Sequence, residues 1–182
     1  YKHREKFQQL VNSIIMSVER ARGVTYRLLG FAKRLESNYA LLDVNHVLKE
    51  VLGFLEKEAE DRNVRIEMNL AEDLPKIHSD LGQLEQVFLN LLSNALNAVE
   101  EIHTCQSDDQ YIAVTIEDNG CGMGEEIQRH IFEPFFTTKK EYGTGLGLSI
   151  TYGIVSKLGG EIKVSSEEGQ GSAFSIYLPI NA

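Results

Sequence analysis

The sequence contains little that would cross-link it or bind a metal through sulfur. It has only two cysteines, Cys105 and Cys121, among 182 residues, and no tryptophan. Two cysteines cannot form a metal-binding knuckle on their own, so we interpret them as free thiols in a reducing compartment. Their presence as free thiols favours a cytoplasmic location.

Long hydrophobic runs and positive charge are also scarce. No apolar stretch approaches the ~20 residues of a membrane span, and no signal-peptide pattern is present. The 18 Lys and Arg residues against 27 Asp and Glu residues give a net charge of -9. Because a phosphate backbone requires a basic face, this balance argues against nucleic acid as the main partner. A nucleotide is not excluded, since backbone N–H groups and a metal ion can hold its phosphates.

The first part of the chain has the pattern of one long helix, over residues 4–36. Its apolar residues recur at alternating spacings of four and three, which is typical of a helical bundle. We expect this helix to pack on another chain or on a further segment; the alternative is that it folds back onto its own domain. The apolar seam comprises Phe7, Val11, Ile14, Val18, Ala21, Thr25, Leu28, Ala32 and Leu35.

The rest of the chain mixes helical and strand patterns without a regular alternation of the two. This mixture predicts an α+β fold, a two-layer sandwich with a mixed, mostly antiparallel sheet and helices on one face. Asn38–Asp43 is interpreted as a polar break. The expected helices are Val44–Asp61, Leu81–Glu100 and Leu146–Leu158, and the expected strands are Val64–Leu70, Ile112–Ile116 leading into Asp118, Glu161–Ser165 and Ala173–Leu178.

Glycines gather in the second half, nine of the fifteen lying between Gly120 and Gly160. The cluster Gly143–Gly147 stands directly before an expected helix, where backbone N–H groups and the helix dipole attract an anion. It is therefore a candidate phosphate cradle, although a simple turn is the alternative. No Lys-Ser/Thr pair follows, so it is not a P-loop, and no strand precedes it, so it is not a dinucleotide fingerprint.

Two asparagines and one aspartate are the candidate polar ligands. Asn90 and Asn94 lie one turn apart on the expected helix Leu81–Glu100, and their carbonyl oxygens suit Mg²⁺. A solvated helix face is the alternative. Asp118 ends a strand, where its carboxylate would accept a hydrogen bond from an adenine amino group or merely form a turn. Ser172 precedes the last strand and would support the same base edge.

The stretch Ile131–Lys139, rich in aromatic residues, lies between the two glycine clusters. Three phenylalanines and a proline in a polar context predict a structured, movable loop. Lys139 or Lys140 would reach a terminal phosphate. The alternative is that Phe132 and Phe135 close the core.

Together these segments resemble the catalytic ATP-binding domain of sensor histidine kinases, which shares a Bergerat-type fold with gyrase B, Hsp90 and MutL. The likeness covers residues 43–180, and four motifs carry it in the family's order. They are DLGQLEQVFLNLLSNALNA at Asp80–Ala98 (N box), DNGCGM at Asp118–Met123 (G1 box), IFEPFFTTK at Ile131–Lys139 (F box) and GTGLGLSI at Gly143–Ile150 (G2 box).

The first helix resembles, less specifically, the second helix of a dimerisation and histidine-phosphotransfer hairpin. On this reading residues 1–37 belong to that hairpin, whose first helix would be absent, and residues 43–182 form the catalytic domain. The chain would be a fragment of a longer kinase. The phospho-accepting histidine of the family is followed by an acidic residue and Asn-Pro, and none of the five histidines here has that context.

The resemblance implies roles for individual residues. Asn94 would ligate Mg²⁺ with help from Asn90, both as catalytic residues, and Asp118 would bind the adenine amino group. In hydrolysing relatives a glutamate occupies the position of Asn90 and activates water, so its absence favours transfer over hydrolysis. The full set of implied nucleotide contacts is Asn94, Asp118, Gly120, Gly122, Lys139, Gly143, Thr144, Gly145, Leu146, Gly147 and Ser172, and the lid carries Phe132, Phe135 and Phe136.

The resemblance therefore implies a histidine kinase fragment that binds ATP and Mg²⁺. Its γ-phosphoryl group would go to a histidine of the dimerisation domain and then to an aspartate of a response regulator. The full-length protein would be a homodimer in the cytoplasm, or anchored in the inner membrane. Two alternatives stay open: an ATPase or serine kinase of the same superfamily, and a non-catalytic nucleotide-binding or interaction module.

Overall fold

The computed structural model describes Phe7 and residues 39–96, 100–106, 110–139 and 143–180. The chain divides into two units, residues 1–37 and 38–182, and the account below concerns the second. The expected helix over residues 4–36 lies outside the described residues, apart from Phe7.

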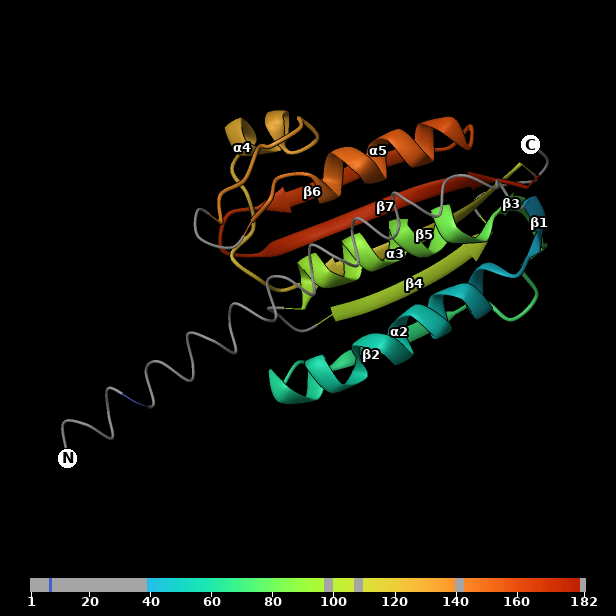
Figure 1. Cartoon of the computed structure of the whole chain (residues 1–182), viewed down its shortest axis with the longest axis horizontal. Coiled ribbons are helices and arrows are strands. Elements are labelled where there is room, and N and C mark those ends of the chain that lie inside the picture. Colours follow the sequence, from blue (N-terminus) through green and yellow to red (C-terminus); the bar gives the residue numbers. More distant parts are fainter. Residues whose placement is uncertain (1–6, 8–38, 97–99, 107–109, 140–142, 181–182) are drawn as a thin grey trace. The chain divides into compact units, whose positions relative to one another are not determined.

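A five-stranded sheet forms one layer of the second unit (Figure 1). Its strand order is β2-β4-β5-β7-β6, in which β2 pairs with β4 in parallel and every other pair is antiparallel. The expectation of a mixed, mostly antiparallel sheet is confirmed. The strands are β2 (Ile66–Leu70), β4 (Glu100–Gln106), β5 (Tyr111–Asp118), β6 (Glu161–Glu167) and β7 (Gly171–Pro179).

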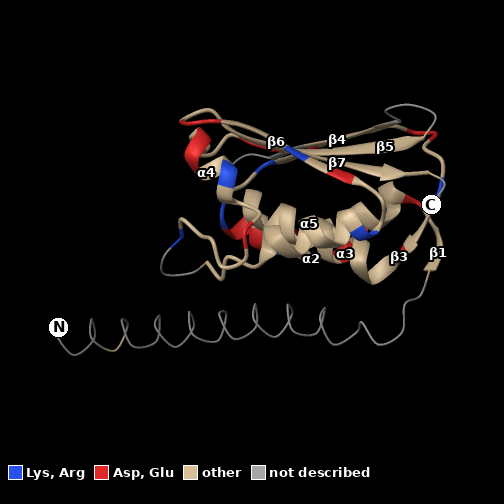
Figure 2. Cartoon of the chain, turned by 90° about the horizontal axis from the view of Figure 1, so that it is seen from above, with Lys and Arg blue, Asp and Glu red and all other residues tan. Residues whose placement is uncertain are grey.

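Three helices form the second layer, all on one face of the sheet (Figure 2). They are α2 (Val44–Asp61), α3 (Leu81–Ala95) and α5 (Gly147–Lys157), while the short α4 (Glu125–His130) follows β5. Strands β1 (Tyr39–Leu42) and β3 (Ile77–Asp80) form a separate antiparallel pair. This arrangement confirms the predicted two-layer α+β sandwich.

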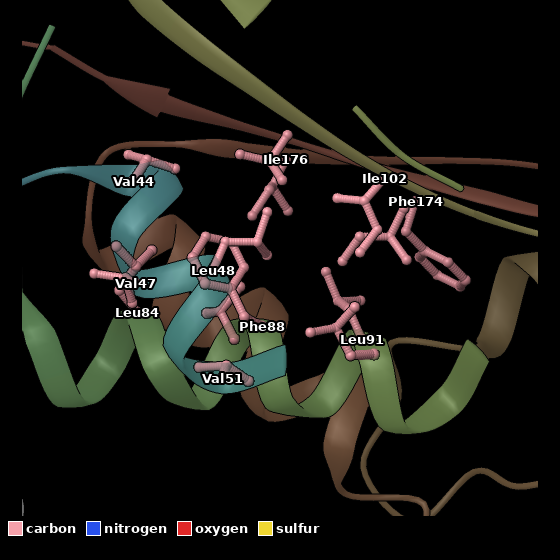
Figure 3. Close-up of a cluster of buried hydrophobic side chains, with 14 of the residues drawn as sticks. Val44, Val47, Leu48, Val51, Leu84, Phe88, Leu91, Ile102, Phe174 and Ile176 are labelled. Atoms are coloured by element: carbon pink, nitrogen blue, oxygen red, sulfur yellow. The ribbon is translucent and has the colours of Figure 1, made fainter. Parts of the chain in front are cut away.

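The hydrophobic core lies between the helices and the sheet (Figure 3). Alternate residues of the central strands face the helices, as the period of two in a strand requires, and residues three and four apart on α2 and α3 face the sheet. Phe88 of α3 is completely buried in this layer. Figure 3 labels core residues from both layers: Val44, Val47, Leu48, Val51, Leu84, Phe88, Leu91, Ile102, Phe174 and Ile176.

Two element predictions were wrong. The segment interpreted as a polar break contains β1, which pairs with β3, an element that the pattern did not predict either. The helix expected to reach Glu100 ends at Ala95, and Glu100 instead begins β4. In β4 only Ile102 is a large apolar residue on the inner face, so its period of two is too weak to recognise. The short helix α4 was also missed.

No helix among the described segments combines the length and the apolar character that crossing a bilayer requires.

Candidate functional site

Helix α3 carries both asparagines of the N box, but it places them in different environments. Asn90 is buried, with 8% of its surface exposed, whereas Asn94 is exposed. One turn of helix separates them, so both lie toward the same side of α3. Only Asn94 therefore presents its amide oxygen to solvent in this structure.

The side chain of Asn90 joins α3 to α5. Its Nδ2 donates to the Gly147 carbonyl oxygen at 3.0 Å and to Thr151 Oγ1 at 3.2 Å, and its Oδ1 accepts from Gln86 Nε2 at 2.9 Å. The Thr151 hydroxyl in turn donates to the Gly147 carbonyl oxygen at 3.0 Å. This network brings the predicted residues Asn90 and Gly147 together, although they are far apart in sequence.

Helix α5 begins without a side-chain cap, unlike α2 and α3. Asp43 caps α2 by accepting from His46 N, and Asp80 caps α3 by accepting from Gln83 N. At the start of α5 the capping position is Leu146, no side chain of the described residues accepts from the first N–H groups, and the first turn has no acidic residue. The Ser149 hydroxyl bonds only the Leu146 carbonyl oxygen, to which it donates at 3.0 Å. The first backbone N–H groups of α5 consequently remain directed at whatever anion approaches the G2 box.

The loop before α5 is folded closely against the F box. Gly145 has φ +64° and accepts a backbone hydrogen bond from Phe135 N at 2.9 Å. A Cβ atom at Gly145 would lie only 2.3 Å from the Phe135 carbonyl carbon, so no larger residue fits. Gly143 is similarly packed and donates to the Lys139 carbonyl oxygen at 2.8 Å. Thr144, between these glycines, is half-buried.

Asp118 is the last residue of β5, and it organises the turn that follows. One of its carboxylate oxygens accepts from Gly120 N at 2.8 Å. In the described part of the chain the other oxygen has no protein donor. Since Asp118 is only half-buried, that oxygen remains able to accept a hydrogen bond from a ligand.

The G1 box interlocks with the turn between β6 and β7. Gly122 has φ +62°, and a Cβ atom there would lie 1.8 Å from the Glu167 carbonyl oxygen. Gly171 has φ +106°, and a Cβ atom there would lie 1.9 Å from the Asp118 carbonyl oxygen. Gly169 N completes the contact by donating to the Cys121 carbonyl oxygen at 2.7 Å. The tight approach explains why glycine is required at both turns.

Ser172, which was predicted to support the same base edge as Asp118, lies beside Asp118 in the sheet. The two residues are direct partners in the β5–β7 register. The Ser172 hydroxyl is 3.0 Å from that of Ser166, which also accepts from Met123 N and donates to the Gly171 carbonyl oxygen. The sequence reasoning missed Ser166; its only signal was a polar residue at the inward position after Ile162 and Val164 of β6.

The three phenylalanines of the F box have separate positions. Phe132 and Phe136 are half-buried and pack against the core, and the Phe132 ring lies 5.4 Å from that of Tyr152. Phe135 is 75% exposed and has φ +69°, which is unusual for a bulky residue. The alternative that Phe135 closes the core is therefore wrong. Lys139 is exposed, and residue 140 lies outside the described residues.

Thr151 and Gln86 are further site residues that the sequence reasoning missed. Thr151 is fully buried, and each bonds Asn90 directly. The only sequence signal of Thr151 was a polar residue at a core position of a helix, and Gln86, which is half-buried, had none.

The donor set of the site fits Mg²⁺ bound together with phosphates. Among the described residues no three His, Cys, Asp or Glu side chains gather to hold a metal ion. Mg²⁺ typically takes one or two protein oxygens and completes its shell with water and substrate phosphates. One exposed amide oxygen, that of Asn94, meets this requirement.

Comparisons with known proteins show which family the chain resembles. Residues 79–182 match the family model described as histidine kinase-, DNA gyrase B-, and HSP90-like ATPase. Sporulation kinase E of Bacillus subtilis is 34% identical to the chain over 174 residues, which cover 93% of this chain and 23% of that kinase. The chain thus spans about a quarter of the length of this curated relative.

Two solved structures resemble the fold. The catalytic domain of histidine kinase ThkA has a TM-score of 0.71 and 28% identity, over 80% of this chain and 99% of that one. Full-length ShkA in complex with AMPPNP has a TM-score of 0.74 and 27% identity, over 85% of this chain and 35% of that one.

Proposed function

This chain belongs to the histidine kinase-, DNA gyrase B-, and HSP90-like ATPase family, and from that membership we propose that it is the ATP-binding catalytic part of a sensor histidine kinase. The curated relatives it matches are sensor and sporulation kinases, which supports this choice within the family. Because the chain spans only 23–38% of those three proteins, the activity of a whole kinase is part of the proposal.

ATP is the proposed substrate, with its adenine at Asp118. The carboxylate oxygen not bonded to Gly120 would accept a hydrogen bond from the adenine amino group. Guanine carries a carbonyl oxygen at that position, which a carboxylate repels, so the site should prefer ATP to GTP. Gly122 lies in the turn that follows Asp118, with the Glu167 carbonyl oxygen where a side chain would be, so any support it gives the base would come from its backbone. Ser172 stands beside Asp118 in the sheet, where it would support the same edge.

The phosphates would lie at the N-terminus of α5. The observation that carries this proposal is the start of that helix, which has neither a side-chain cap nor an acidic residue in its first turn. Aspartates cap α2 and α3, and the short uncapped α4 has two glutamates in its first turn. An acidic cap would compete with a phosphate for the same N–H groups. Gly143, Gly145 and Gly147 let the backbone approach closely, and Lys139 is a further proposed contact for a terminal phosphate.

Mg²⁺ is proposed as the cofactor, held by Asn94 and the phosphates. When bound, the ion would neutralise phosphate charge and orient the γ-phosphoryl group. Asn94 supplies a neutral oxygen ligand on the exposed side of α3.

The proposed reaction is phosphoryl transfer to a histidine. An imidazole nitrogen attacks the γ-phosphorus, the bond between that phosphorus and the β–γ bridging oxygen breaks, and ADP leaves. Asn90 occupies the position at which a hydrolase of the superfamily would need a carboxylate base. An amide cannot accept the proton of an attacking water, so transfer to an external acceptor is favoured over hydrolysis.

The partners follow from this reaction. Residues 1–37 would belong to the dimerisation hairpin and residues 43–182 to the catalytic domain. None of the five histidines has the expected acceptor context, so the acceptor would lie on a dimerisation helix outside this chain. A response-regulator aspartate would receive the phosphoryl group. We propose a cytoplasmic site of action within a homodimeric full-length kinase.

Calorimetric titration with a non-hydrolysable ATP analogue tests the nucleotide site. We expect the parent chain to bind the analogue more tightly with Mg²⁺ than without it, and to bind a GTP analogue at least tenfold more weakly, the cost of one lost and one repulsive base contact. Asp118→Ala should lose most of the affinity. Asp73→Ala, an exposed aspartate in the turn after β2, is the matched control.

Equal binding by the parent and Asp118→Ala would contradict the adenine assignment, and no binding by the folded parent would reject the kinase proposal for this chain. Transfer itself is checked by supplying a histidine-bearing dimerisation hairpin as a separate polypeptide with labelled ATP. An acid-labile, base-stable phosphoryl group on that polypeptide is the expected product. Steady release of phosphate without any acceptor would instead favour an ATPase.

A further inference from the structure

The buried position of Asn90 assigns it a role different from that of Asn94. Its two Nδ2 hydrogens and its Oδ1 all have protein partners, namely Gly147, Thr151 and Gln86. Only 8% of the surface of Asn90 is exposed. A buried amide satisfied in this way is held in one orientation, because rotating it would leave at least one of its polar atoms without a partner.

The chemistry of the partners fixes which atom of the amide faces α5. A carbonyl oxygen can only accept, so the Asn90 atom 3.0 Å from the Gly147 carbonyl oxygen must be the nitrogen. The Thr151 hydroxyl donates to that same carbonyl, which leaves its lone pair to accept the second Nδ2 hydrogen. The amide oxygen therefore points along α3 to Gln86 Nε2.

We propose that Asn90 is a positioning residue that fixes the first turn of α5, and that Asn94 alone supplies the protein ligand to Mg²⁺. This inference rests on the proposed nucleotide site and refines it. A metal ligand must present oxygen, and the group that Asn90 presents to α5 is a donor. Its oxygen is already bonded within α3, whereas the Asn94 side chain is exposed.

The network contacts the N-terminus of α5, where the phosphates are proposed to bind. Gly147 is the first residue of the helix, and its carbonyl oxygen receives both the Asn90 amide and the Thr151 hydroxyl. These bonds tie the first turn of α5 to the helix that carries Asn94, and Leu148 and Ile150 of α5 add apolar contacts with the core. The loop before α5 is held separately, through Phe135 and Gly145.

Substitution by aspartate separates the two roles of an asparagine. Asn94→Asp would present an oxygen, with added charge, and should retain Mg²⁺-dependent binding of the ATP analogue. Asn90→Asp would place a carboxylate oxygen against the Gly147 carbonyl oxygen and should weaken binding at least tenfold, because a buried hydrogen bond between neutral groups is replaced by repulsion between two oxygens, one of them charged. A metal-binding Asn90 would instead tolerate aspartate, and that result would overturn the proposal.

Thr151 tests the network away from any metal. Thr151→Val keeps the shape of the side chain and removes the hydroxyl, and we expect about a three- to tenfold loss of analogue affinity, the effect of one buried hydrogen bond. Thr151→Ser should restore it. The loss should be the same factor with and without Mg²⁺, whereas Asn94→Ala should lower the ratio of the two affinities. Thr115→Val, whose hydroxyl bonds Ser175 within the sheet, is the matched control.

Amide hydrogen exchange gives a readout that does not need nucleotide. In Thr151→Val and Asn90→Ala the amides of residues 150 and 151, in the first turn of α5, should exchange faster, while those of α2 should not change. If the parent binds no analogue, the proposed function fails but the exchange result still decides the role of Asn90. Unchanged exchange in α5, or a loss confined to the Mg²⁺-dependent part of binding, would overturn the positioning role.

Discussion

Gly145 and Gly147 are two residues apart in one motif, but the physical reasons for glycine differ between them. Gly145 has φ +64°, and the backbone of Phe135 occupies the space a side chain would need. Gly147 is helical, and a Cβ atom there would lie 3.8 Å from Asn90, which is an ordinary contact. The protein itself therefore requires glycine at position 145 and has room for alanine at position 147.

The pair predicts opposite results for two alanine substitutions. Gly147→Ala should leave stability unchanged or raise it by up to about 1 kcal/mol, since alanine favours a helix, yet it should weaken binding of the ATP analogue where the phosphates approach the backbone. Gly145→Ala should lower stability by about 2 kcal/mol or more, because it combines a left-handed φ with a backbone clash. Denaturant unfolding and calorimetry on both variants measure the two effects.

Full nucleotide affinity in Gly147→Ala would mean that the phosphates do not approach α5 at this residue. Full stability in Gly145→Ala would mean that the loop can retreat from Phe135. Gly153→Ala is the matched control for both, because it lies in the same helix and a Cβ atom there meets nothing within 4 Å.

At the scale of elements, a hydrogen-bond network ties the first turn of α2 to the edge of the sheet. Thr104 of β4 is 4% exposed, and its hydroxyl donates to Asn45 Oδ1 at 2.9 Å and accepts from Ala71 N at 3.1 Å. Asn45 Nδ2 then donates to the Ala71 carbonyl oxygen at 2.7 Å. The cluster thus joins α2 and β4 to the residue that follows β2, around the buried Thr104 hydroxyl.

Thr104→Val should therefore destabilise the domain without changing the nucleotide site. The substitution keeps the volume and leaves Asn45 Oδ1 without its donor, so we expect a loss of about 1–3 kcal/mol in the free energy of unfolding. Thr115→Val, with a half-exposed hydroxyl on the other face of the sheet, should lose less. A stability equal to that of the parent would show that water replaces the Thr104 hydroxyl at no cost.

The elements that the sequence predicted best are those with a strong period. Helix α2 begins and ends at the predicted residues, Val44 and Asp61, because seven buried apolar or small residues recur along one face and Asp43 caps it. Strand β4 was missed because its inward positions include the polar Thr104, which serves the network with Asn45. A polar residue that is buried because of its hydrogen bonds interrupts the alternation of apolar and polar residues by which a strand is recognised.

The candidate site was predictable in part for the same reason. Asp118 and the glycines of the G2 box stand out because their types and spacing are typical of residues that bind a ligand. Thr151 and Ser166 do not, because each acts only through partners that are distant in sequence. Their roles depend on how α3 packs against α5 and how β6 packs against the G1 turn. A local sequence pattern does not contain information about such long-range contacts.

At the scale of the whole molecule, the proposed function would bring an anionic substrate to an acidic protein. The chain has a net charge of -9, so its long-range field repels nucleotide phosphates. The proposed attraction is local. It comes from neutral groups, namely the backbone N–H groups of α5 and the amide of Asn94, and from the Mg²⁺ ion that Asn94 would hold. Such contacts act at hydrogen-bond range, where salt screens little, while the repulsion acts over distances that salt does screen.

This contrast predicts an unusual dependence on salt. With Mg²⁺ in excess, raising NaCl from about 50 to 200 mM should change the affinity for the ATP analogue by less than about threefold, where a protein that holds 6–10 phosphates with basic side chains loses about 10³-fold or more. The association rate should rise slightly, because screening weakens the repulsion between two anions. Stopped-flow binding and calorimetry across the salt series measure both quantities. A steep fall in affinity would instead assign the phosphates to lysine and arginine side chains, and Lys139→Ala, by flattening that fall, would identify this residue as one of them.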